Sequence, residues 1–457
     1  MTFASPFFLS IVLPVLVAAY FALPAGRRNA FLLAASLLAY AWVAPVGIAI
    51  LLVLTVSNHL LAVLAARRRD SDRVRRTAIF AAVALDAATL AACKYGGFLA
   101  DRLGPGFPRF ALAAGMSFYV FQLISYVADA GSGKTSVGSM KDVLLYVCFV
   151  PKVPCGPIAR FYDFTASCKD HSLNPADIAY GTRRFFVGLA KKALLADMLA
   201  RAVDPIFGTP VEMLPCAYCW LGAIAYSLQI YFDFSGCSDM AIGLARIFGY
   251  KLPENFDFPY SSRSIQEFWR RWHMSLSFWL RDYVYIPLGG SRHGAVRACL
   301  NTMAVFLLCG IWHGSTWTFV LWGALHGAAV VAERLGLKRL LAAVPEAFAR
   351  AYVLLFVAFG WVVFRSPSVE YALGFMRNMV LGNPSHPASG FVQATNFVTF
   401  GETWIMLAAM LAAFAAPCRI LSAIDRRTRG ILFAAVALLA YVFAMTGNVT
   451  PGIYEKF

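Results

Sequence analysis

Apolar runs long enough to cross a lipid bilayer recur along nearly the whole chain, and they constrain its fold more than any other feature. They cover 6–23, 30–43, 45–65, 77–93, 110–128, 299–311, 315–333, 350–364, 403–416 and 430–446. Only 14% of the residues are charged, against about 25% in a typical soluble protein. Because a spanning helix needs roughly 20 apolar residues, we expect an all-α polytopic membrane protein. About 11 transmembrane helices are predicted, with shorter re-entrant or interfacial ones. Residues 1–457 are predicted to form a single integral-membrane domain.

The arginines predict the orientation of these helices. Basic residues gather in the loops after the first, third and fifth apolar runs, at Arg27, Arg28, Arg67, Arg68, Arg69, Arg73, Arg75, Arg76, Lys134 and Lys141. The positive-inside rule places these loops in the cytoplasm and the N-terminus outside. The net charge of +16 is then explained by topology and by attraction to anionic lipid headgroups. No nucleic-acid partner is expected.

The ten cysteines are scattered along the chain. Cys216 and Cys219 have C-x-x-C spacing, but no second pair or neighbouring histidine completes a zinc-binding set. We therefore expect most cysteines to be small core residues, and no metal site.

His326 lies in an apolar run that is predicted to be helical at membrane depth. A histidine in that position is usually paired, faces a wet cavity, or takes part in chemistry. Trp322 lies one turn before it, and Gly323 and Gly327 share a helix face. Two glycines at that spacing let another backbone approach closely. The pattern therefore predicts a crowded protein interior around His326.

Polar residues interrupt the apolar trend in two further places. Asp233, Ser235 and Asp239 lie in one apolar stretch, where carboxylates are costly unless they line a cavity or pair with cations. Both a structural polar network and a substrate path are consistent with this pattern. His313 lies in a break between helices, flanked by glycine, where it would either cap a helix or orient a site.

An amphipathic helix is predicted to begin at Ser264, where Ser-x-x-Glu spacing is typical of a capping box. Tryptophans at helical spacing on one side of it are read as packing. His273 falls four residues after Trp269, which places it on this aromatic side. Arg270 and Arg271 lie close by in sequence. Such a helix suits the membrane interface or the wall of a funnel.

Three long segments carry a resemblance to a known family. They are Tyr231–Gly249 (YFDFSGCSDMAIGLARIFG), the run from Pro253 through Ser291 that includes SSRSIQEFWRRWHMSLSFWLRDYVYIPLGGS, and Trp312–Gly327 (WHGSTWTFVLWGALHG). The chain resembles the membrane-bound O-acyltransferase family, and Asp282–Gly290 (DYVYIPLGG) resembles its bacterial branch that acetylates alginate. Weaker matches cover most of the remaining chain. Cys155 and Cys237 depart from that branch, which more often has alanine and tyrosine there.

The resemblance implies a ring of tilted helices around a central tunnel, with His326 as the active-site residue and His273 as the second site residue. His313, Trp322, Asp233, Ser235, Asp239, Arg270 and Arg271 are predicted substrate-binding residues. A sugar hydroxyl attacking a thioester needs a base, and neutral imidazole can serve. We expect His326 to be that base and His273 to hydrogen-bond the thioester donor.

The implied function is transfer of an acetyl group across the membrane to an alginate-like polysaccharide outside. No permanently bound cofactor is expected; acetyl-CoA or an acyl carrier protein would be the cytoplasmic cosubstrate. Membrane lipid and periplasmic acetyltransferase subunits are the expected partners, and the bacterial inner membrane the location. Cellulose, peptidoglycan or another glycan, and D-alanyl transfer to teichoic acid, remain alternatives. A transporter or a scaffold of an export complex is the non-enzymatic alternative, although no internal repeat favours a transporter.

Overall fold

The computed structural model describes residues 3–104, 113, 115–153, 156–167, 174–383, 405–406, 408–410, 412–413, 426–446 and 452–453. Over these ranges all regular elements are helices, which confirms the all-α prediction. The helices long and apolar enough to cross a membrane are Gly47–Arg67, Asp72–Gly97, Gly294–His313, Trp317–Ala343 and Glu346–Arg365. Shorter apolar helices cover Phe8–Ala22 and Gly430–Met445. The count of about 11 spans stays a prediction, and the run 403–416 falls largely outside the described residues.

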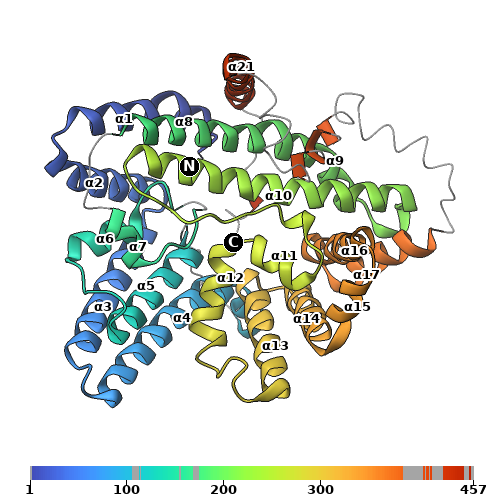
Figure 1. Ribbon diagram of the computed structural model, residues 1–457, viewed down its shortest axis with the longest axis horizontal. Helices are drawn as coiled ribbons and strands as arrows, with labels where there is room; N and C mark the ends of the chain where they lie inside the picture. Colours follow the sequence, from blue (N-terminus) through green and yellow to red (C-terminus); the bar gives the residue numbers. More distant parts are fainter. Residues whose placement is uncertain are drawn as a thin grey trace. The chain divides into compact units, whose positions relative to one another are not determined.

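The first of two compact units is drawn from Met1–Gly188 and Cys237–Glu254. Its helices are η1 (Phe8–Val12), α1 (Leu13–Ala22), α2 (Ala25–Val43), α3 (Gly47–Arg67), α4 (Asp72–Leu103), α5 (Met116–Ser132), α6 (Met140–Cys148), α7 (Phe161–Ser167) and most of α8 (Pro175–Ala190). Helices α3, α4 and α5 pack against one another (Figure 1). Asn58 on α3 donates a 2.9 Å hydrogen bond to buried Asp86 on α4. Amide-to-carboxyl pairing at mid-helix therefore stabilises this contact.

The second unit is drawn from Leu189–Gly236 and Asn255–Ile453, so α10 (Cys216–Ile247) contributes to both units. Its other helices are η2 (Lys191–Ala196), α9 (Asp197–Gly208), η3 (Val211–Met213), η4 (Pro259–Ser261), α11 (Ile265–Arg271), α12 (Met274–Leu280), η5 (Arg281–Tyr285), α13 (Gly294–His313), α14 (Trp317–Ala332), η6 (Glu333–Leu337), α15 (Lys338–Ala343), α16 (Glu346–Arg365), α17 (Val369–Leu381) and α21 (Arg426–Met445). His273, His313 and His326 all lie in this unit. That residues 1–457 form a single integral-membrane domain remains a prediction.

Helices α13 and α14 lie side by side (Figure 1) because glycines remove the side chains between them. A Cβ atom on Gly323 would collide with the carbonyl oxygen of Phe306 and lie 3.3 Å from the Cα atom of Gly310. At Gly327 the nearest atoms belong to side chains, with the sulfur of Met303 at 2.9 Å. The predicted close backbone approach is therefore confirmed at Gly323.

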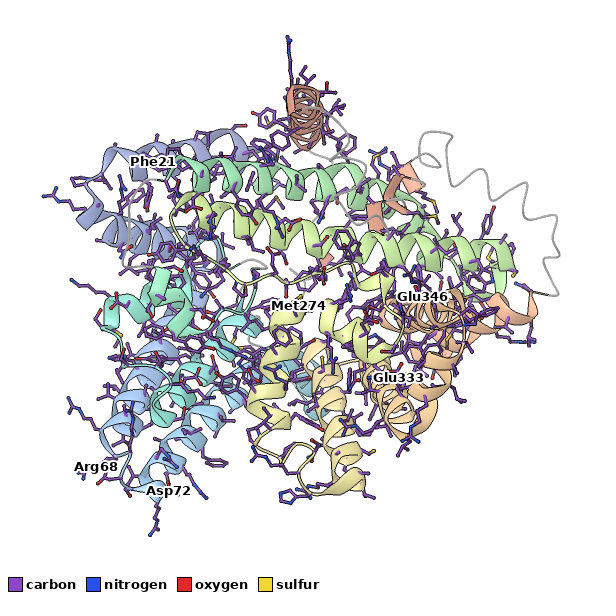
Figure 2. The ribbon with its side chains drawn as sticks, in the orientation of Figure 1. Phe21, Arg68, Asp72, Met274, Glu333 and Glu346 are labelled. Carbon is purple, nitrogen blue, oxygen red and sulfur yellow. The ribbon has the colours of Figure 1, made fainter. Side chains whose placement is uncertain are left out.

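The amphipathic helix predicted from Ser264 onward is interrupted. The Ser264 hydroxyl accepts from the Glu267 amide at 3.0 Å, so the predicted helix start is confirmed, but α11 ends at Arg271. His273 then adopts a left-handed conformation, with φ 44° and ψ 52°, and α12 begins at Met274 (Figure 2). The assignment of His273 to the aromatic side of one continuous helix was wrong. The amphipathic period continues across the break, so the sequence pattern does not reveal where α11 ends and α12 begins.

Among the described cysteines, Cys237 departs from the sequence-based expectation. Cys93, Cys148 and Cys219 are buried free thiols, and Cys216 is also unbridged. Cys237, however, is disulfide-bonded. Spacing alone does not reveal such a bond, because the pairing of cysteines cannot be read from a sequence.

Candidate active site

The His326 side chain is completely buried within aromatic rings. We call this surround the aromatic box: Trp269, Phe306, Trp322 and Phe356, whose ring centroids lie 4.9–6.4 Å from that of the imidazole. Trp269 and Phe356 stand nearly perpendicular to it, at 86° and 88°. This confirms the crowded interior predicted around His326. The ring is therefore closely enclosed by aromatic side chains.

Each ring nitrogen of His326 has a different environment. Nδ1 lies 3.2 Å from the indole Nε1 of Trp269, which donates a hydrogen bond to it. Nε2 is buried and has no hydrogen-bond partner in the described part of the chain. It faces Gly360 on α16, where an added Cβ atom would lie 2.9 Å from it. The absence of a side chain at Gly360 therefore leaves the space that Nε2 occupies.

A carboxylate holds the helices of Trp269 and His326 in register. Glu333, which directly follows α14, accepts hydrogen bonds from the first two amides of α11, those of Ile265 at 2.5 Å and Gln266 at 2.9 Å (Figure 2). Those amides have no partner within their own helix, and an anion is favoured at a helix N-terminus. The two hydrogen bonds to Glu333 thus help to position Trp269 against His326.

Trp322 connects two of the predicted site histidines. Its ring centroid lies 4.9 Å from that of His326 and 5.1 Å from that of His313. Both histidines and the indole are buried, and His313 also contacts Phe364, at 5.1 Å. The structure therefore brings together the three predicted residues His313, Trp322 and His326.

His273 is held by Asn255 at the start of α12. Its Nδ1 lies 3.0 Å from the Oδ1 atom of Asn255, which also accepts from the backbone amide of Ser275 at 3.3 Å and its hydroxyl at 2.9 Å. The Asn255 carbonyl accepts from the amide of Met274 at 2.9 Å. A left-handed non-glycine residue is uncommon and costs energy, and such strain clusters at functional sites.

His273 lies outside the candidate membrane spans, and its surroundings keep it neutral. Phe234 on α10 contacts its ring edge-on at 4.6 Å. Burial penalises the charged form of the ring and lowers the pKa of His273 to about 3. Its imidazole therefore stays uncharged at physiological pH.

The predicted polar substrate-binding residues of α10 have structural partners. Asp233 accepts from Lys192 at 2.6 Å and from the amide of Ile453 at 2.6 Å, and Lys192 also binds Asp197 at 2.9 Å. Ser235 is buried, and its hydroxyl has no hydrogen-bond partner among the residues described here. Asp233 therefore belongs to a buried ionic cluster, which corresponds to the structural alternative left open by the sequence.

Three other predicted residues are distributed differently. Asp239 belongs to the first unit, where it accepts from Arg184 at 2.7 Å. On α11, Arg270 is exposed, whereas Arg271 pairs with Glu267 at 3.0 Å and with Asp257 at 3.2 Å. Among the described residues, no group of three His, Cys, Asp or Glu side chains could hold a metal ion.

The sequence does not predict the hydrogen-bond partners of His326 and His273. Trp269 was read as packing, and Asn255, Gly360 and Glu333 were not singled out. The signal available for Asn255 and Gly360 was their position inside or beside the family-like segments. Nothing in the sequence relates either residue to a particular histidine.

Comparison with known proteins identifies the class of protein. The model of the membrane-bound O-acyltransferase family matches residues 116–373, a range that contains the aromatic box and the buried histidines His273, His313 and His326. The chain belongs to the membrane-bound O-acyltransferase family. It is therefore a polytopic membrane acyltransferase.

The chain is similar in sequence to several members of this family. It is 37% identical over 386 residues to the probable alginate O-acetylase AlgI of Azotobacter vinelandii, covering 81% of this chain and 76% of that protein. It is 38% identical over 273 residues to the peptidoglycan O-acetyltransferase of Helicobacter pylori, covering 57% and 52%. It is also 29% identical over 253 residues to the teichoic acid D-alanyltransferase of Streptococcus thermophilus, covering 49% and 57%.

Proposed function

We propose that this protein moves an acetyl group from a cytoplasmic thioester donor across the membrane, for O-acetylation of an extracytoplasmic, alginate-like polysaccharide. The observation that carries the proposal is His326, a fully buried imidazole on an apolar helix. One ring nitrogen is engaged by Trp269, and the other faces the space left by Gly360. A buried titratable side chain in a membrane helix is a functional site by default.

The reaction sets two requirements that the site histidines can meet. When a hydroxyl oxygen attacks a thioester carbonyl, a base must accept the hydroxyl proton, and a hydrogen-bond donor must stabilise the charge that develops on the carbonyl oxygen. His326 and His273 are the residues we assign to these roles. His313 and Trp322 border His326 and are assigned to substrate binding.

Most of the charged residues could bind substrate only by giving up an existing ion pair. Asp233, Asp239 and Arg271 already form ion pairs, so each would have to exchange its present partner for substrate. Exposed Arg270 and buried Ser235 carry no such cost. Positively charged Arg270 suits the phosphate-bearing end of a donor such as acetyl-CoA.

The proposed setting is the bacterial inner membrane with a periplasmic N-terminus. The loop between α3 and α4 is rich in arginine, with Arg67, Arg68 and Arg69 at its start. A basic cytoplasmic loop would attract an anionic donor, either acetyl-CoA or an acyl carrier protein. Periplasmic acetyltransferase subunits would then deliver the acetyl group to the polymer.

Reconstitution tests this proposal directly. Proteoliposomes with radiolabelled acetyl-CoA on the face of the α3–α4 loop, and with alginate oligosaccharides and the periplasmic acetyltransferase subunits on the opposite face, should transfer label to the oligosaccharides, and His326→Ala should not. A donor that reacts equally from either face would refute the proposed direction. Peptidoglycan fragments and teichoic acid, tested as parallel acceptors, distinguish the acceptor classes suggested by the relatives.

A further inference from the structure

Asp86 is a completely buried carboxyl group near the middle of α4, in the candidate membrane span Asp72–Gly97. Its Oδ1 atom accepts a hydrogen bond from Nδ2 of Asn58 on α3 at 2.9 Å. Its Oδ2 atom is buried and has no hydrogen-bond partner within the described ranges. An ionised carboxylate in such a place is very costly unless a cation pairs with it. The charge state of Asp86 therefore depends on what surrounds it.

The hydrogen-bond partner of Asp86 is a neutral amide in a fixed orientation. The atom of Asn58 that contacts Asp86 also lies 2.9 Å from the backbone carbonyl oxygen of Leu54. A carbonyl oxygen only accepts hydrogen bonds, so this atom is the amide nitrogen. Its two hydrogens are then used, one for Leu54 and one for Asp86. Because the amide carries no charge, it does not compensate a carboxylate.

The polar atoms around Asp86 lack a donor, not an acceptor. Helices α3, α4 and α5 pack against one another (Figure 1), and Oδ1 of Asn58 and Oε1 of Gln122 on α5 are buried without a hydrogen-bond partner among the residues described. Gln122 lies one turn after Tyr119, which interacts electrostatically with Asp86, so both are on the same side of α5. An ionised carboxylate would add further acceptors, whereas a carboxylic acid supplies an O–H donor, directly or through one water.

The charged residues of the three helices lie towards the helix ends. On α4 the nearest to Asp86 are Arg76 and Lys94, ten and eight residues away, which is roughly 15 and 12 Å along the helix axis. On α3 the nearest to Asn58 is Arg67, nine residues away, or roughly 13 Å, and on α5 it is an acid, Asp129. The other titratable side chains on these helices are His59, whose Nδ1 lies 3.1 Å from the hydroxyl of Tyr126, together with Cys93, Tyr95, Tyr119 and Tyr126.

We infer that Asp86 is a proton-binding site of the membrane domain: its carboxyl group is neutral between α3, α4 and α5, with Oδ1 accepting from Asn58 and Oδ2 carrying the proton. Loss of this proton would leave an uncompensated negative charge where the three helices meet. The packing of these helices therefore depends on pH. The inference does not rest on the proposed acyl transfer, because Asp86 belongs to the first unit and the site histidines to the second.

Infrared spectroscopy tests the inference, because a neutral carboxylic acid and a carboxylate absorb at different frequencies. At neutral pH, the difference spectrum between the wild-type protein and Asp86→Asn in proteoliposomes should contain a neutral-acid band that shifts in deuterium oxide. Asp233→Asn is the matched control, since Asp233 is also buried but pairs with Lys192 at 2.6 Å. The difference spectrum of this control should contain a carboxylate band instead.

A carboxylate band in the Asp86→Asn difference spectrum overturns the inference. So does failure of this variant to fold, because an amide has nearly the shape of the neutral acid. A sodium ion is the competing occupant, since it also neutralises a carboxylate. Replacing potassium chloride with sodium chloride should leave the neutral-acid band unchanged. Loss of the band in sodium would identify a sodium site and overturn the assignment of a proton.

The pH dependence of stability provides a second measurement. At neutral pH the folded chain holds a proton on Asp86 that the unfolded chain has lost, so stability should fall as the pH rises, by up to about tenfold in the unfolding equilibrium constant per pH unit. Asp86→Asn does not ionise. In chemical denaturation in detergent it should lack this part of the pH dependence and be more stable than the wild type at neutral pH. An Asp86→Asn variant that is less stable than the wild type, or has the same pH dependence, overturns the inference.

Discussion

Adding one methyl group at Gly360 tests whether acyl transfer depends on the position of the His326 ring. A Cβ atom at this position of α16 would lie 2.9 Å from Nε2 of His326, 3.7 Å from Cε1 and 3.8 Å from Cδ2. Non-bonded heavy atoms are most stable about 3.5–4.0 Å apart. In Gly360→Ala the ring or the helix must therefore move by roughly 0.6 Å or more.

Two magnitudes follow from that displacement. Overpacking a core costs about 1–3 kcal/mol, offset by up to about 1 kcal/mol because alanine favours the helix more than glycine does. The net loss of stability should be about 0–3 kcal/mol. A misplacement near 1 Å in an active site can cost about a hundredfold in rate, so acyl transfer should fall by roughly ten- to a hundredfold.

Gly222→Ala is the matched control for this variant. Its Cβ atom would lie 2.8 Å from the Cγ2 atom of Ile206, which is a similar clash in an apolar helix without a histidine. We expect a comparable change in melting temperature in detergent, with full activity per folded protein. The reasoning is refuted if Gly360→Ala is folded and as active as the wild type, or if Gly222→Ala loses equal activity.

Three other measurements test the supporting structure. Lys192→Met leaves the buried carboxylates Asp233 and Asp197 without their cation, so we expect a loss of about 3–5 kcal/mol; an unchanged melting temperature would contradict this. Glu333→Ala removes the acceptor of two α11 amides and should cost about 2–3 kcal/mol, measured by chemical denaturation, with Glu333→Gln less affected. The folded-state pKa of His273 is about 3, below its ordinary value of 6.5, so the unfolded chain binds a proton that the folded chain does not. Stability should therefore fall as the pH falls from 6.5 towards 3, and His273→Gln should show a weaker dependence; equal pH dependence would contradict the assignment.

The sequence predicted those features of the site that lie within one helix. Trp322 and His326 are one turn apart on α14, and Gly323 lies between them, so helical periodicity alone relates them. The close approach of another backbone followed from the small residues on that face. These features depend only on the spacing of residues within one helix, which can be read directly from the sequence.

Helical periodicity does not predict the contacts between helices. Trp269 and His326 are 57 residues apart, and His273 and Asn255 are 18 apart. The aromatic spacing from Trp269 to Trp279 continues through the left-handed residue at His273, so periodicity predicted one helix where there are two. Asn255, outside the helix, supplies the acceptor and carbonyl at the start of α12, and a local pattern does not contain that partner.

The chemical nature of the partners separates the two kinds of buried polar residue in this protein. The buried carboxylates of Asp233 and Asp239 are compensated by Lys192 and Arg184, which stabilise a charge in a poorly solvated interior. The histidines instead have uncharged partners, an indole at His326 and an amide at His273. A carboxylate partner would favour the imidazolium, whereas a neutral donor or acceptor selects one tautomer of the neutral ring. These partners thus favour a defined N–H direction in each imidazole, which suits the proposed transfer from a thioester to a hydroxyl.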